Sequence, residues 1–259
     1  MDDPAVIKAI QDGMKKRALF IADGHHRYET ALNYRNMMRE KDKNHTGVEP
    51  YNYVMMYFSN MDDEGMTICP THRVIHSLKS FDGDGFIGRC KEFFDINEFS
   101  YNDNTEPEVR ARFLKALETS GREKTSFGLH IRQRDAYCLL SIKSPEAMDR
   151  AFGASIPDVF KELDVTVLHS LILSKILGIT QEAQERQENL VYVKSFDEAL
   201  NACGNENNQL VFLLNPTRIE QVKAVAEGGH VMPQKSTYFY PKLLSGLVIN
   251  LLGTADVKA

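Results

Sequence analysis

The first part of the chain is best understood from one stretch, Phe20-Ile-Ala-Asp-Gly-His-His-Arg-Tyr-Glu29. Its beginning belongs to an apolar run over residues 18–22, which is typical of a buried strand. Asp23 and Gly24 interrupt the run, and residues 26–41 favour a helix. The sequence therefore predicts a strand, a tight turn and a helix start in immediate succession.

The polar residues of this corner suit an anionic ligand. The first turn of a helix leaves backbone N–H groups unpaired and carries a partial positive charge. Gly24 lets a ligand approach the backbone closely, and Arg27 offers a planar fork for phosphate or carboxylate. His25 and His26 can donate hydrogen bonds or move a proton near neutral pH. We therefore expect a phosphate pocket here.

Two other interpretations of the corner remain open. In the first, the histidines satisfy local backbone groups and Arg27 pairs with Glu29 or Glu40. In the second, His25 and His26 join His72 around a metal ion. The second is disfavoured because adjacent helical residues point about 100° apart and rarely bind one ion together.

The composition limits the class of protein. The chain has 259 residues, of which 42% are hydrophobic and 26% charged, as in ordinary soluble proteins. Its net charge of -5 argues against general nucleic-acid binding, which needs surplus Lys and Arg. The sequence shows neither a long apolar run nor a signal-peptide pattern at its start. The four cysteines are widely spaced and form no CxxC pair: Cys69, Cys90, Cys138 and Cys203. They indicate reduced thiols, and we therefore expect a cytoplasmic protein.

Helical and strand patterns alternate along the rest of the chain. Further helices are expected at residues 4–16, 86–94, 106–118, 164–178 and 217–227, with Asp164 as a cap. Strands are expected at residues 53–58 and 66–69, at 127–131 and 137–142, and at 210–214, the first four forming two hairpins. This arrangement predicts an α+β fold with a mixed β-sheet, in two lobes that meet near residues 76–84.

Two more polar clusters are candidates for the same pocket. His72 and Arg73 follow Pro70 at the end of an expected strand, where a solvated strand end is the plain alternative. Lys235, Ser236 and Thr237 combine a cation with two hydroxyls, which can hold a phosphate or simply form a polar turn. His169 is interpreted as structural.

The corner resembles that of a known superfamily. Gly24-His-His-Arg-Tyr-Glu29 is similar to the Gly-Cys-His-Arg-Tyr-Glu corner of sulfiredoxin and the Gly-Glu-Arg-Arg corner of ParB, which hold nucleotide phosphates. His25 stands where sulfiredoxin has its cysteine, so sulfiredoxin chemistry is not implied. The corner most resembles the free serine kinases of this group. The whole chain resembles the family called domain of unknown function 1015, through residues 22–27, 51–56, 70–74, 232–242 and 245–246.

The resemblance implies a phosphotransferase acting on serine or phosphoserine in serine biosynthesis, with ADP or ATP and Mg2+. It implies catalytic roles for His25, His26 and Arg27, and a nucleotide site formed by Asp23, Gly24, Arg27, His72, Arg73, Lys235, Ser236 and Thr237. A ParB-like nucleotide switch without turnover and a phosphohydrolase are the alternatives.

The resemblance also implies a domain organisation. Residues 1–80 are expected to be part of a ParB/sulfiredoxin-like domain, residues 81–205 an α+β lobe, and residues 206–259 the C-terminal strands and helix that complete the fold and the anion site. Family members carry a further N-terminal portion with the expected catalytic Glu. This chain is therefore expected to be a fragment that binds ligands without turnover.

Overall fold

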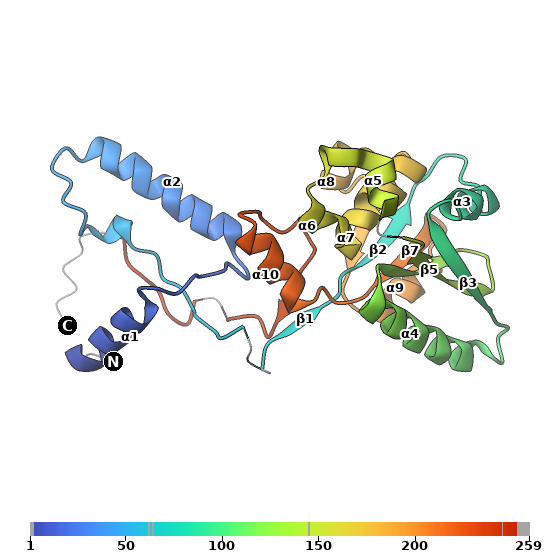
Figure 1. Cartoon of the computed structure of the whole chain (residues 1–259), viewed down its shortest axis with the longest axis horizontal. Coiled ribbons are helices and arrows are strands. Elements are labelled where there is room, and N and C mark those ends of the chain that lie inside the picture. The colour runs from blue at the N-terminus through green and yellow to red at the C-terminus, as the bar shows by residue number, and fades with distance from the viewer. Residues whose placement is uncertain (1–2, 62, 64, 145, 245, 253–259) are drawn as a thin grey trace. The chain divides into compact units, whose positions relative to one another are not determined.

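The computed structural model describes residues 3–61, 63, 65–144, 146–244 and 246–252. The chain forms two compact units, one from residues up to 65 together with those from 241, the other from residues 66–240 (Figure 1). The expected lobe boundary near residues 76–84 lies inside the second unit, and the division into segments 1–80, 81–205 and 206–259 stays a prediction. Ser245 of the quoted motif and parts of the expected 62–65 turn lie outside the described residues.

The second unit contains a six-stranded sheet with the strand order β3-β5-β4-β7-β2-β6. Its strands are β2 (His72–His76), β3 (Phe94–Ser100), β4 (Ser126–Ile131), β5 (Ala136–Ile142), β6 (Leu190–Val193) and β7 (Asn208–Leu214). The α+β class is confirmed, and so is the β4–β5 hairpin. The prediction of a mixed sheet was wrong, because every pairing between described strands is antiparallel. Parallel neighbours need a crossover between adjacent strands, whereas here the helical connections join strands that are not neighbours.

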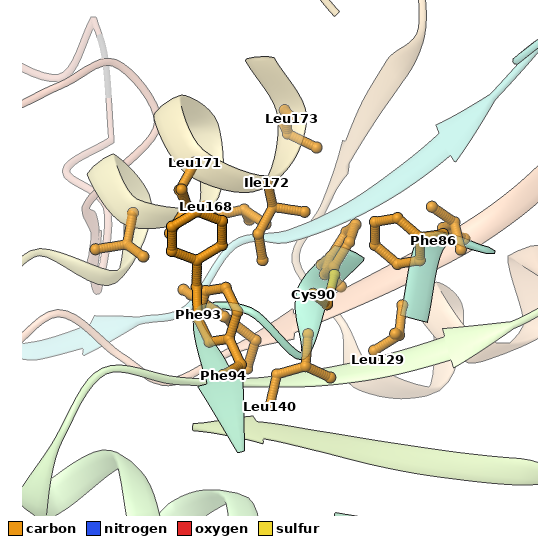
Figure 2. Close-up of a cluster of buried hydrophobic side chains, with 14 of the residues drawn as sticks. Phe86, Cys90, Phe93, Phe94, Leu129, Leu140, Leu168, Leu171, Ile172 and Leu173 are labelled. Atoms are coloured by element: carbon orange, nitrogen blue, oxygen red, sulfur yellow. The ribbon is translucent and has the colours of Figure 1, made fainter. Parts of the chain in front are cut away.

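Helices cover both faces of this sheet. One hydrophobic cluster joins the sheet to α3 (Gly83–Cys90), α5 (Glu146–Phe152) and the π-helix η3 (Val167–Ile176), as Figure 2 shows in part. The other joins it to α4 (Glu106–Glu123) and α9 (Phe196–Ala202). Neighbouring residues of a strand point to opposite faces, so Ile75 lies in the first cluster and Val74 in the second. Burial on both faces explains why every residue of β5 is buried.

The remaining elements of the second unit are short. They are β1 (Thr67–Cys69), which pairs with β8 (Tyr238–Tyr240), and the helices η2 (Gly153–Ser155), α6 (Asp158–Lys161), α7 (Asp164–Thr166), α8 (Gln181–Glu185) and α10 (Ile219–Glu227). Asp164 is the first residue of α7 and Leu163 is its N-cap, so the expected cap at Asp164 was wrong. The expected helix at residues 86–94 ends at Cys90, and β3 begins at Phe94.

The first unit consists of α1 (Pro4–Met14), α2 (His25–Lys41), the short helix η1 (Pro50–Asn52) and irregular segments. The strands expected at residues 18–22 and 53–58 are not formed. A strand needs a neighbour for its backbone hydrogen bonds, and neither segment has one among the described residues. Leu19 and Phe58 are each 57% exposed. No helix in the described part of the chain is long and apolar enough to cross a membrane.

Gly128 of β4 provides a test of the packing beneath α4. A Cβ atom added there would lie 2.7 Å from Cζ of Phe113 and 3.0 Å from Cβ of Leu213, both buried. We expect Gly128→Ala to lower the free energy of unfolding by about 1–3 kcal/mol, because the core must shift to accept the methyl group. Urea unfolding followed by circular dichroism measures this.

Gly88→Ala in α3 is the control, because a Cβ there meets nothing within 4 Å. It should leave stability unchanged or raise it by up to about 1 kcal/mol. Equal unfolding midpoints for Gly128→Ala and the wild type would show that the core is looser than the structure indicates.

Candidate functional site

The start of α2 has three backbone N–H groups for which the described residues supply no acceptor. Gly24 is its N-cap, with a left-handed φ of 87° and no side-chain hydrogen bond to the helix. The first helical bond runs from the N–H of Tyr28 to the carbonyl of Gly24, at 3.0 Å. The N–H groups of His25, His26 and Arg27 therefore have no acceptor among the described residues. The first turn itself contains no acidic residue, and the carboxylate that precedes it is Asp23, just before the N-cap.

Two cations meet at this helix start. Arg27 folds back over the turn, so that a Cβ on Gly24 would lie 2.7 Å from its Nη2 atom. Oδ2 of Asp23 lies 3.5 Å from Nη2 of Arg27 and 3.1 Å from Nζ of Lys242. The partner of Arg27 is thus Asp23, rather than Glu29 or Glu40. The Arg27 side chain is 74% exposed and open to a ligand.

The two histidines of the corner differ in their contacts. Nδ1 of His26 lies 3.4 Å from Oε2 of Glu29, and the side chain is exposed. His25 is half-buried and makes no side-chain hydrogen bond within the described residues. No group of three or more His, Cys, Asp or Glu side chains in that same part of the chain is placed to hold a metal ion.

Arg73 anchors the other cluster, which lies in the second unit. Its side chain is completely buried, and it makes three hydrogen bonds. Nε donates to Nε2 of His169 at 3.2 Å, Nη2 donates to the carbonyl of Lys235 at 2.9 Å, and Nη1 donates to the carbonyl of Thr71. The ring of Tyr192 lies 4.9 Å from its Cζ atom. No carboxylate pairs with Arg73 in the described structure. Burial lowers its pKa to about 10, so the guanidinium stays charged at neutral pH.

The hydrogen bond from Arg73 fixes the proton on His169. Because a guanidinium only donates, Nε2 of His169 must accept, and the proton sits on Nδ1. Nδ1 lies 2.7 Å from Oε1 of Gln184, whose Nε2 in turn donates to Oγ of Ser174 at 2.8 Å. Burial, helped by the charge of Arg73, lowers the pKa of His169 to about 4. His169 is therefore a neutral link between β2 and the π-helix.

His72 is neutral for a similar reason. Its Nδ1 accepts from the N–H of Leu214 at 3.2 Å, and its side chain is buried. Burial first, and the charge of Arg73 second, lower its pKa to about 4. His72 therefore presents its remaining ring proton on Nε2 and does not titrate near neutral pH.

Lys235, Ser236 and Thr237 lie on the loop before β8. Lys235 is exposed and has a left-handed φ of 58°, with its carbonyl bound by Arg73. Ser236 is buried and donates from Oγ to the carbonyl of Pro233 at 2.6 Å, while its own carbonyl accepts from Oγ1 of Thr217. Thr237 is half-buried.

The structure thus brings the predicted residues together in two groups. Asp23, Gly24, His25, His26 and Arg27 lie in the first unit, and His72, Arg73, Lys235, Ser236 and Thr237 lie in the second. Sequence reasoning missed Lys242, although it ends the most specific motif, and it missed Tyr192 and Gln184, which no motif marks.

The sheet and its two helical layers define an α+β protein. Residues 1–166 match the family described as protein of unknown function (DUF1015), and the chain belongs to this family. A comparison with curated proteins gives no match.

Similar solved structures have low identity to the chain. A conserved hypothetical protein from Pyrococcus furiosus is 17% identical, with a TM-score of 0.37, over 70% of this chain and 59% of that one. A free serine kinase variant in complex with ADP is 14% identical, with a TM-score of 0.37, over 70% of this chain and 56% of that one. A free serine kinase in complex with AMP is 14% identical, with a TM-score of 0.35 and the same coverage. The chain thus spans less than two thirds of the length of these structures.

The neutral state of His169 makes a prediction about pH. Its pKa is about 4 in the folded protein and near 6.5 when unfolded, so the unfolded chain binds more protons between these values. Stability is therefore lost as the pH falls through this window. Protonation of His169 alone should lower the free energy of unfolding by about 2 kcal/mol between about pH 7 and about pH 5.

The measurement is urea unfolding of the wild type and of His169→Gln at both pH values. Comparing the change in the free energy of unfolding with pH between the two proteins removes the contribution of Asp164, which both share. That contribution has the opposite sign, because burial raises the Asp164 pKa to about 7. If the variant loses as much stability as the wild type, His169 is not held neutral.

Proposed function

We propose that this chain holds the nucleotide phosphates of a small-molecule phosphotransferase that acts on serine or phosphoserine. The observation that carries the proposal is the first turn of α2, whose three N–H groups lack an acceptor in the described structure and lie beside Arg27 and Lys242. The similarity of this corner to those of the free serine kinases supports an adenine nucleotide as the ligand. The proposal rests on the corner and its motif, not on the structural matches.

The corner suits a phosphate group in both shape and charge. A phosphate has several oxygens that can accept at once from neighbouring N–H groups and from a guanidinium fork. The carboxylate of Asp23 pairs with both cations, Arg27 and Lys242. Asp23 holds Arg27 and Lys242 at the turn. A phosphate would take the place of the Asp23 carboxylate as the partner of these two cations, and the helix would not have to move.

Phosphoryl transfer needs mainly positioning and charge stabilisation from the protein. The serine hydroxyl would form a new bond to phosphorus while the bond from phosphorus to the leaving nucleotide oxygen breaks, and the hydroxyl proton would pass to His25 or His26. The reverse direction passes the phosphoryl group from phosphoserine to ADP. His25 and His26 would orient the transferred group or exchange its proton.

A magnesium ion fits this corner only together with the nucleotide. Mg2+ is commonly bound through one or two carboxylates and substrate phosphates. Asp23 is the carboxylate that the turn would supply to the ion. The nucleotide phosphates would supply the further oxygen ligands. When bound, the ion would neutralise charge on the phosphates. We place this activity in cytoplasmic serine metabolism. Lys235, Ser236 and Thr237 are proposed as anion ligands of the second unit, with Arg73 and His72 as their buried support.

Arg27→Met tests the corner directly. We expect the affinity for ADP to fall at least about tenfold, because the variant loses a charge-assisted, two-pronged contact. Isothermal titration calorimetry measures the affinity. Arg35→Met is the matched control, since Arg35 lies on the same helix and its side chain contacts Asn36.

Equal ADP affinity in Arg27→Met and the wild type would overturn the assignment. Repeating the titration with phosphoserine separates the two classes of function. Mutual enhancement of binding supports the phosphotransferase, whereas ADP binding that ignores phosphoserine supports a nucleotide switch.

Gly24→Ala makes a separate test of the turn. Alanine is strained at a φ of 87°, and its Cβ would lie within 3.0 Å of the Arg27 guanidinium. We expect the side chain of Arg27 to be displaced and the ADP affinity to fall about fivefold or more, for a strain of about 1 kcal/mol. Gly13→Ala, where nothing lies within 4 Å, should bind ADP normally. Normal binding by Gly24→Ala would show that the left-handed turn is not needed.

A further inference from the structure

We propose that the second unit has a phosphate site of its own, formed by the ammonium groups of Lys194 and Lys235 against the rings of Tyr238 and Tyr192. It rests on the proposed function only for the identity of the ligand, a phosphorylated small molecule. Its residues are separate from the α2 corner, so each site can fail without the other.

Two cation–π contacts join the same two segments of the chain. Nζ of Lys194 lies 4.1 Å from the ring centroid of Tyr238, and Nζ of Lys235 lies 6.0 Å from that of Tyr192. Tyr192 and Lys194 are two residues apart, on and just beyond the edge strand β6, and therefore project to the same side. Both ammonium groups thus belong to one surface.

These two lysines have aromatic neighbours, whereas several other cations of the second unit pair with acids. Arg110 pairs with Glu106 at 2.7 Å, Arg134 with Glu98 at 2.8 Å, and Lys161 with Asp149 at 2.5 Å. Neither Lys194 nor Lys235 pairs with a carboxylate among the described residues. An aromatic ring orients an ammonium group without cancelling its charge. Both lysines are therefore positioned and still available to an anion, which offers stronger, charge-assisted hydrogen bonds.

Arg73 adds a third uncompensated charge beneath this surface. Buried charges are normally paired, but the acceptors of Arg73 in the described part of the chain are all neutral: two carbonyls and His169. Its guanidinium lies against the same Tyr192 ring as Lys235. Its hydrogen bond to the carbonyl of Lys235 also holds that residue in its left-handed conformation. The surface therefore collects three positive charges in a protein whose net charge is -5, and an anion would compensate them.

The test is calorimetric titration of the full chain carrying Arg27→Met, so that the α2 corner does not contribute. Inorganic phosphate and phosphoserine should both bind, and serine, which lacks the phosphate, should not. Lys194→Met and Lys235→Met should each weaken phosphate binding about tenfold, since each removes one charge-assisted contact. Tighter binding of phosphoserine than of phosphate identifies a small-molecule site, and equal binding shows that only the phosphate group is recognised.

Lys223→Met is the matched control, because Lys223 is an exposed lysine of the same unit whose charge is paired with Glu227. Phosphate affinity unchanged in both test variants, or no phosphate binding at millimolar concentrations, overturns the inference. Phosphate binding that depends on Lys194 while ADP does not bind at all leaves the inference standing and removes the proposed nucleotide site.

Discussion

The buried guanidinium of Arg73 connects three parts of the second unit that are far apart in sequence. It reaches His169 across 96 residues and Lys235 across 162 residues. Burying a charge is costly unless its donors are satisfied, and removing Arg73 would leave the acceptors on His169 and Lys235 unpaired. The start of β2, the π-helix and the loop before β8 are therefore held in place by one side chain. Because Arg73 can only donate, it also fixes the proton on His169 and the orientation of Gln184.

The elements that could be predicted from sequence are those whose signal is local. The apolar periodicity of α4, the turn between β4 and β5 and the apolar run of β7 are each contained in one segment, and each predicted element is present. The runs at residues 18–22 and 53–58 have the same strand-like composition, yet neither forms a strand. A strand is completed by a neighbour, which its own residues do not specify. The antiparallel order of the sheet was missed for the same reason.

The two groups of site residues show the same contrast. The helix start at Gly24 and Arg27 follows from local chemistry, because unpaired N–H groups belong to any first turn. That Lys242 pairs with Asp23 across the length of the sequence could not be seen in either segment alone. Arg73 shows most clearly what could not be predicted from sequence. A polar residue at a strand end is expected to have a solvated side chain or to contact a ligand. Its complete burial depends on the π-helix packing over it, and no property of residues 70–74 indicates this.

The net charge of the chain determines what kind of anion such groups can select. A charge of -5 gives no long-range attraction for anions, and salt screens exposed pairs beyond about 8–10 Å. Recognition must therefore come from short-range contacts, in which several donors meet one ligand. In the proposed corner, the N–H groups at the start of α2 would meet this condition for a phosphate, whose oxygens can accept several hydrogen bonds at once. The proposed lysine site would meet it differently, because Lys194 and Lys235 already lie against tyrosine rings and would lose less side-chain entropy on binding.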